Sequence, residues 1–117
     1  MLDANIQSPE WLLQMTAILE ALNEGVAIVD DQLRVVFANE ALVRLGGYQR
    51  DEVYGRTPDG FFTQQDLPYV MQQNAAAQRD GHHRYEFYLP RKDGEKVPVI
   101  YSVREIPGPR GQQYGLI

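Results

Sequence analysis

Asn74 is the residue whose type and position most suggest a binding site. It stands in a helical pattern whose apolar members Leu67, Val70, Met71 and Ala75 share one face. A carboxamide on an inward-facing helical surface needs a hydrogen-bond partner. A bound ligand could supply that partner, and so could the main chain of the protein itself. The pattern is compatible with both.

Residues that could support catalysis or bind a metal lack the required context. Ser8 and Ser102 have no nearby motif that supplies a base, and Asp30 and Asp31 are explained by a turn. The adjacent His82–His83 pair would point to opposite sides of an extended segment, so the two rings rarely share one metal. We therefore expect no enzyme activity and no metal site, and we interpret the two histidines as solvated loop residues.

The composition limits the partners and the chemistry. The chain has 117 residues, which suits one domain, and a formal net charge of -5. That charge argues against nucleic acid and anionic membranes as partners. Absence of cysteine excludes disulfides, thiolate metal sites and a cysteine nucleophile. No apolar run reaches the roughly 18 residues of a membrane span. We expect a cytoplasmic protein.

The N-terminal segment has the pattern of an amphipathic helix. Ser8 and Pro9 suit the N-cap and first helical position, and Gly25 suits the end. Apolar residues recur at helical spacing, namely Trp11, Met15, Ile18 and Leu22. We assign residues 1–24 to this helix and residues 25–117 to a core domain.

The core pattern predicts an α+β fold with a five-stranded antiparallel sheet. Short helices between its two groups of strands must cover one face. Turn residues separate the strands, above all Asp93 and Gly94 at the centre of a hairpin. The predicted strands are 26–29, 35–38, 85–90, 97–103 and 112–117, and the predicted helical segments are 39–45, 50–54 and 66–79.

Two ordered sets of residues resemble the PAS domain family over about residues 17–117. The central set comprises Asn39, Ala41, Leu45, Gly47, Tyr48, Glu52, Gly55 and Arg56. The hairpin set comprises Arg91, Lys92, Asp93 and Gly94, followed by Val97, Pro98 and Val99. Gln49 stands where the family has a serine or threonine cap. The chain also stops at Ile117, before the family's closing Asp-Ile-Thr, so we expect an excised sensor domain.

The resemblance implies a sensory module that regulates an output domain, such as a histidine kinase, a cyclic-dinucleotide enzyme or a transcription activator. PAS domains hold ligands between the sheet and the middle helices. By pattern the lining would be Ile28, Phe37, Leu42, Leu45, Phe62, Val70, Met71, Asn74, Phe87, Val99, Tyr101 and Val103. The alternative is that these side chains simply fill the core. The family also suggests an ion pair between Glu52 and Lys92, although the two charges could equally be independent.

The identity of any cofactor remains unknown. Haem-binding PAS domains use a histidine on the long middle helix, and residues 66–79 contain none, which argues against haem. The light-sensing flavin subfamily needs a cysteine where this chain has Gly55, Arg56, Thr57 and Pro58, so a cysteinyl flavin adduct is excluded. We expect a colourless protein.

The apolar stripe of the N-terminal helix has two interpretations. It could cover the outer face of its own sheet, where Ile100 is apolar. It could instead pair with a second copy, as N-terminal PAS helices often do, through Trp11, Met15, Ile18 and Leu22. We expect the homodimer. Two functions follow: a sensor that binds a small ligand in its core, or a ligand-free dimerisation module.

Overall fold

The computed structural model describes residues 9–107 and 113–116. Its helices are α2 (Pro9–Glu20), α3 (Glu40–Gly46), α4 (Arg50–Val53), the 3₁₀ turn η1 (Pro58–Gly60) and α5 (Leu67–Asp80). Its strands are β1 (Ala27–Val29), β2 (Val35–Ala38), β3 (His82–Pro90), β4 (Lys96–Pro107) and β5 (Gln113–Leu116). No helix in these ranges is both long and apolar enough to cross a bilayer.

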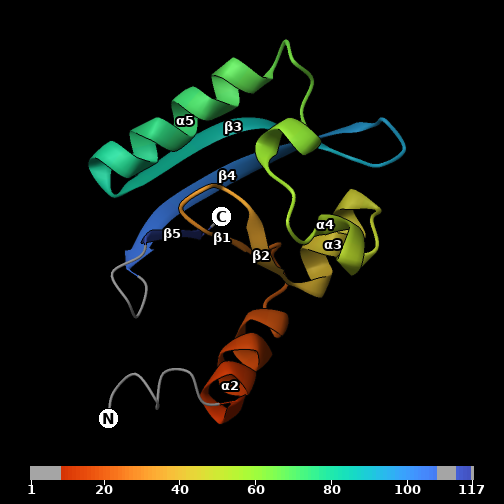
Figure 1. The fold of residues 1–117 in the computed structure, drawn as a ribbon. Coiled ribbons are helices and arrows are strands. Elements are labelled where there is room, and N and C mark those ends of the chain that lie inside the picture. The colour runs from red at the N-terminus through yellow and green to blue at the C-terminus, as the bar shows by residue number, and fades with distance from the viewer. Residues whose placement is uncertain (1–8, 108–112, 117) are drawn as a thin grey trace.

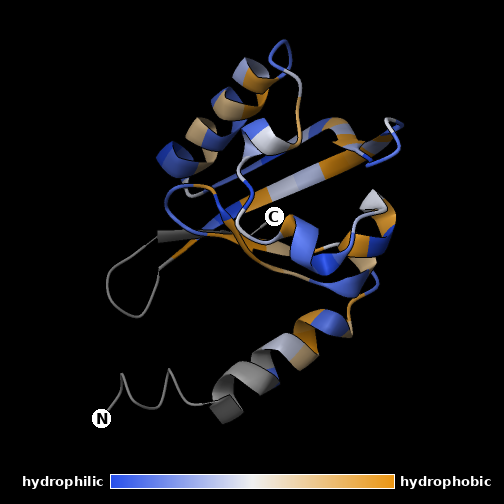
Figure 2. Cartoon of the chain, turned by 45° about the vertical axis from the view of Figure 1, so that its right-hand side comes forward, coloured by the Kyte–Doolittle hydropathy of each residue, from blue (hydrophilic) through white to orange (hydrophobic). Residues whose placement is uncertain are grey.

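The strands form the predicted five-stranded antiparallel sheet, in the order β2-β1-β5-β4-β3. Helix α5 packs against β3 and β4, and α4 packs against β2 (Figure 1). Helix α2 extends away from the sheet, on the side of the molecule remote from α5 (Figure 1). Strands β1 and β2 are hydrophobic throughout, whereas β3 and β4 carry both hydrophobic and hydrophilic residues (Figure 2).

A bulge in β2 changes which residues face the helices. Ile28 pairs with Phe37 but Val29 pairs with Val35, so Val36 is an extra residue without a partner. A bulge shifts the alternation of all residues beyond it. Val35 and Ala38 are therefore both buried, although an uninterrupted strand would place them on opposite faces.

The short helices α3 and α4 have the caps that their sequences favour. The Asn39 side chain accepts a hydrogen bond from Leu42 N, and Gly47 ends α3 at a φ of 75°. A Cβ at Gly47 would lie 3.1 Å from the guanidinium of Arg91. At the start of α4, the Glu52 carboxylate accepts a hydrogen bond of 2.7 Å from Gln49 N. Glu52 thus supplies the half of a capping box that does not depend on a serine or threonine at the N-cap.

The two histidines lie in strand β3, so the prediction of a solvated loop was wrong. Gly81, at a φ of 86°, ends α5 and turns the chain at once, so that pairing begins at His82. His83 Nε2 lies 2.5 Å from Gln73 Oε1, and the ring stacks on Tyr85 at a centroid distance of 5.8 Å.

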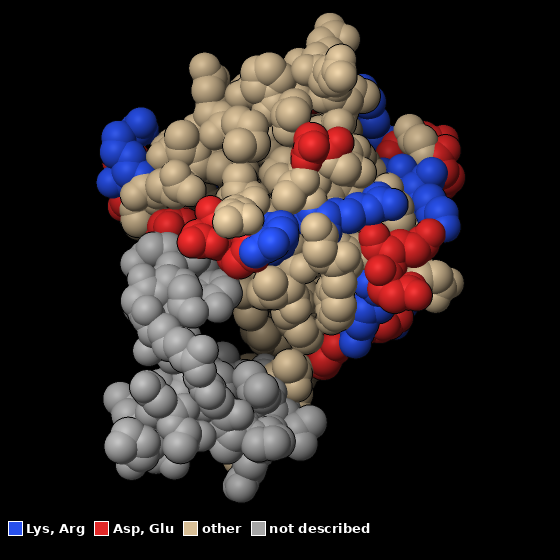
Figure 3. Space-filling view, viewed as in Figure 1, with Lys and Arg blue, Asp and Glu red and all other residues tan. Residues whose placement is uncertain are grey.

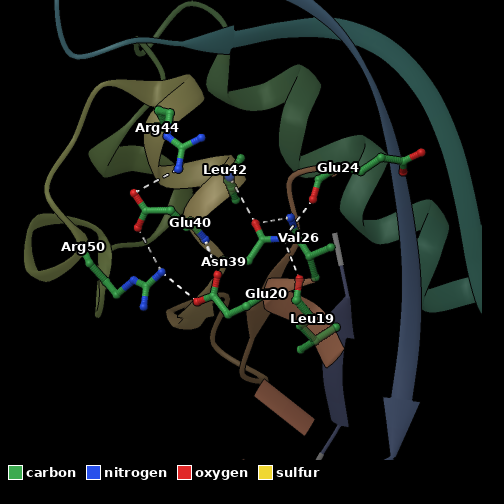
Figure 4. A network of polar contacts seen from close by, with 9 residues as sticks. All are labelled: Leu19, Glu20, Glu24, Val26, Asn39, Glu40, Leu42, Arg44 and Arg50. Carbon is green, nitrogen blue, oxygen red and sulfur yellow. Dashed lines mark hydrogen bonds and ion pairs between the residues drawn. The ribbon is translucent and has the colours of Figure 1, made fainter. Parts of the chain in front are cut away.

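Helix α2 is joined to the core by a polar network (Figure 4). Buried Asn39 donates 2.9 Å hydrogen bonds to Leu19 O and Glu24 O, and its Oδ1 accepts one of 2.9 Å from Val26 N. Beside it, the Glu20 carboxylate accepts from Glu40 N at 2.7 Å and pairs with Arg50 at 2.8 Å. The last turn of α2 is therefore fixed to the start of α3.

Candidate functional site

A cavity of about 130 Å³ lies between the sheet and the helices that cover it. One wall comes from β1, β2 and the turn between them, and a second from α3, α4 and η1. Helix α5 and the β3–β4 hairpin complete it. Because protein interiors have few voids larger than a water molecule, a cavity of this size is a candidate binding site.

Half of the residues predicted to line a pocket do lie on this wall. They are Leu42, Phe62, Val70, Asn74, Tyr101 and Val103. They come from α3, the segment after η1, α5 and β4, so the structure brings together residues up to 61 positions apart in sequence (42 to 103). Their role in binding stays a prediction.

Two predicted lining residues, Ile28 and Phe37, are not on the wall. Ala27 and Val29 are buried toward the cavity, so alternation along β1 turns Ile28 to the opposite face. Phe37 pairs with Ile28 across the strands, and the extra residue Val36 explains why its orientation was mispredicted.

Two further predicted residues, Leu45 and Met71, lie on helices but do not face the cavity. Leu45 is exposed on α3, where Leu42 and Val43 line the cavity. Met71 is 42% exposed on α5, where Val70 lies inward. Met71 is separated from Val70 by about 100° around α5, and on this helix that turn points its side chain toward solvent.

Phe87 and Val99, the remaining predicted residues, lie outside the wall, although they pair with each other in the β3–β4 hairpin. The Phe87 ring packs against other aromatic rings, with centroid distances of 6.0 Å to Phe62 and 4.8 Å to Tyr69. These contacts join the three rings in one aromatic cluster beside the start of α5.

Several wall residues were missed from the sequence. Leu33 adopts a φ of 64° in the β1–β2 turn, a conformation that is uncommon for leucine and not visible in the pattern. Tyr48 and Phe61 meet edge-to-face at 5.7 Å, and the guanidinium of Arg56 lies 5.0 Å from the centre of the Tyr48 ring. Their aromatic character and their place beside the short helices were the available clues.

Three of the six polar side chains on the wall are already paired. Arg56 stacks on two rings and donates to Gly60 O at 3.3 Å, and the Thr57 hydroxyl donates to Asp59. The Tyr101 hydroxyl donates to Tyr88 O at 3.0 Å. The side chains of the other three, Tyr48, Asn74 and Tyr85, have no hydrogen-bond partner within residues 9–107 and 113–116, and Asn74 as a residue is only 8% exposed.

Burial also raises the pKa values of two tyrosines on the wall. It raises the pKa of Tyr85 to about 12, with a smaller contribution from neighbouring Tyr69. Burial likewise raises the pKa of Tyr101. Both phenols are therefore neutral at physiological pH. In the part of the chain that the structure describes, no group of three or more His, Cys, Asp or Glu side chains could hold a metal ion.

A family model for the PAS domain matches residues 23–117, which covers most of the chain and all five strands. The chain belongs to the PAS domain family. The ion pair that the resemblance suggested is present in this PAS domain, with Lys92 Nζ 2.5 Å from Glu52 Oε2. It joins α4 to the turn of the β3–β4 hairpin.

Solved structures share the fold at low sequence identity. A PAS domain from a two-component sensor histidine kinase has a TM-score of 0.78 at 12% identity, over 94% of this chain and 95% of that chain. A PAS domain from Colwellia psychrerythraea gives 0.76 at 17% identity, over 90% and 92%. One from an HTR-like protein of Haloarcula marismortui gives 0.74 at 21%, over 93% and 95%. Among curated proteins, none matches the chain.

Proposed function

We propose that this PAS domain is a cytoplasmic, non-catalytic sensor that binds a small molecule in its cavity and regulates an output domain of the same protein. The observation that carries the proposal is an apolar cavity with Asn74 on its wall, a largely buried residue whose carboxamide has no hydrogen-bond partner among the described residues. A polar group that faces an apolar cavity can be paired by a ligand bound there.

A route for the relay runs through helix α3. Leu42 lies on the cavity wall, and its main-chain N–H is hydrogen-bonded to Asn39 at the N-cap. Asn39 in turn holds the carbonyls of Leu19 and Glu24 at the end of α2. A ligand that displaces α3 would therefore move α2, which extends from the domain (Figure 1).

A homodimer through α2 is a second part of the proposal. Ile18 is 60% exposed and Leu22 is 45% exposed, which leaves apolar surface available to a partner. The side chains of Trp11 and Met15, also predicted in this interface, lie outside the described residues. A module that dimerises without a ligand remains the alternative function.

The direct test is mass spectrometry of the native protein purified from its own host. We expect a mass increment from a retained small molecule that disappears on denaturation. Val70→Phe should abolish retention because it fills the cavity, at a folding cost of about 1–3 kcal/mol. Met71→Phe, at the exposed neighbouring position, is the matched control. If Val70→Phe retains as much of the small molecule as Met71→Phe does, the molecule binds outside this cavity.

A further inference from the structure

The chemistry of the cavity wall limits what the ligand can be. This inference rests on the proposed function, since it concerns the same cavity. The wall is largely apolar, and five aromatic rings contribute to it, those of Tyr48, Phe61, Phe62, Tyr85 and Tyr101. Aromatic side chains favour stacked or edge-to-face contact with another ring, which gains about 0.5–1.5 kcal/mol beyond area burial.

The size of the cavity suits one ring. Its volume is about 130 Å³. A dry apolar protein cavity of roughly 150 Å³ accommodates benzene. A single six-membered ring with one substituent therefore matches this volume, whereas a fused two-ring molecule or a cofactor exceeds it.

The charges of the wall favour a neutral ligand. Arg56 is the cation that borders the cavity, and its guanidinium lies 5.0 Å and 5.1 Å from the ring centres of Tyr48 and Phe61. It also donates to Gly60 O. A buried anion needs a cation that is free to pair with it, because its desolvation is otherwise too costly. An anionic ligand would compete with the two rings and with Gly60 O for this one guanidinium, on a wall that is otherwise largely apolar.

Asn74 specifies the polar part of the ligand. The residue is 8% exposed and lines the cavity, and its carboxamide has no hydrogen-bond partner in the described part of the chain. A carboxamide offers an acceptor oxygen and two N–H donors. We propose that the ligand is a neutral, planar molecule about the size of a phenol, whose single polar group hydrogen-bonds to Asn74.

The test compares phenol, toluene and benzoate as probes of the purified protein by NMR titration of backbone and side-chain amides. Phenol and toluene share one shape and differ in the hydrogen-bonding group. We expect phenol to bind about tenfold more tightly than toluene, because toluene leaves the carboxamide unpaired. The side-chain NH₂ signals of Asn74 should shift with phenol, and benzoate should bind most weakly.

Two variants test whether Asn74 causes the preference for phenol over toluene. Asn74→Leu should remove the preference for phenol over toluene, whereas Gln73→Leu should keep it, since Gln73 contacts His83 and does not line the cavity. If Asn74→Leu fails to fold, the test depends on the unmodified protein, in which the side-chain NH₂ signals of Asn74 should shift when phenol binds. Three results would overturn this inference while leaving the proposed function intact. Toluene could bind as tightly as phenol, benzoate could bind most tightly of the three, or phenol could bind without shifting the Asn74 signals. Failure of all three probes to bind would also overturn the inference, whereas the proposed function is decided separately, by whether the native protein retains a small molecule.

Discussion

The side-chain amide of Asn39 donates a 2.9 Å hydrogen bond to the main-chain carbonyl of Leu19, 20 residues earlier in the chain. The same side chain caps α3 and binds Glu24 O and Val26 N. Asn39 is fully buried, and so is its hydrogen bond with Val26 N, whereas its bonds to Leu19, Glu24 and Leu42 are partly buried. One residue thus connects α2, β1 and α3 (Figure 4).

The first prediction concerns the stability that Asn39 provides. Asn39→Ala removes an N-cap, which costs about 1 kcal/mol, and leaves the buried N–H of Val26 unpaired at about 1–3 kcal/mol. We expect the free energy of unfolding to fall by about 2–4 kcal/mol in urea denaturation. A change within 0.5 kcal/mol, as at an ordinary surface site, would contradict this role.

The second prediction distinguishes two roles of Asn39, the capping of α3 and the hydrogen bonds that connect it to α2. Asn39→Asp keeps an acceptor for Leu42 N and Val26 N, but an ionised carboxylate cannot donate to Leu19 O or Glu24 O. Hydrogen exchange should therefore quicken in α2 much more than in α3. Equal protection of α2 in the variant and in the unmodified protein would show that other contacts hold this helix.

A third prediction concerns acid pH. The hydrogen bond from Gln49 N and the pairing with Lys92 lower the pKa of Glu52 below its usual 4.5. A lowered pKa contributes stability above pH 4.5, and this contribution is lost as the pH falls through the folded-state value. Glu52→Gln should therefore be less stable than the unmodified protein at neutral pH, with the difference vanishing in acid. Asp51→Asn, at the neighbouring carboxylate of α4, is the control.

The order of elements was predictable because local chemistry dictates it. Asp93 and Gly94 form the expected hairpin turn, with Gly94 at a φ of 90°, and the alternating residues on either side pair in register. Asn39 and Gly47 mark the ends of α3 as their types suggest. Each of these features depends on neighbours within a few residues.

The site was only partly predictable because its geometry depends on longer-range features. The extra residue Val36 reverses the expected orientation of Phe37, and no composition rule places such a bulge. Leu33 reaches the cavity from a turn through a positive φ. The sequence predicted Asn39 as a cap, but its hydrogen bonds to Leu19 and Glu24 join segments that have no local relation.

The fourth prediction concerns alkaline pH. Burial raises the pKa of Tyr85 to about 12 and also raises that of Tyr101, from the usual 10. A raised pKa contributes stability that is complete below pH 10 and is lost as the pH rises toward the folded value. Ultraviolet absorbance of phenolate should show a late phase coinciding with unfolding. Tyr85→Phe should reduce this phase, whereas Tyr54→Phe, at an exposed site, should not.

The last prediction concerns the proposed dimer. Ile18 lies near the end of α2, and Leu22 follows in the turn after the last helical residue, Glu20; both side chains are exposed. Burying a large apolar side chain is favourable by about 1.5–3 kcal/mol, so two copies gain by joining these side chains. Two-fold symmetry would place the stripe against itself. Sedimentation of the unmodified protein should therefore show a concentration-dependent dimer.

Charged substitutions test whether this face makes the contact. Ile18→Glu with Leu22→Glu should give a folded monomer, because each dimer would then bury like charges opposite one another. Ala17→Glu adds a charge at an exposed position about 100° around the helix from Ile18, and should leave the dimer intact. If the unmodified protein stays monomeric at high concentration, the exposed face of α2 has another role. If the double variant still dimerises, the contact lies on a different surface.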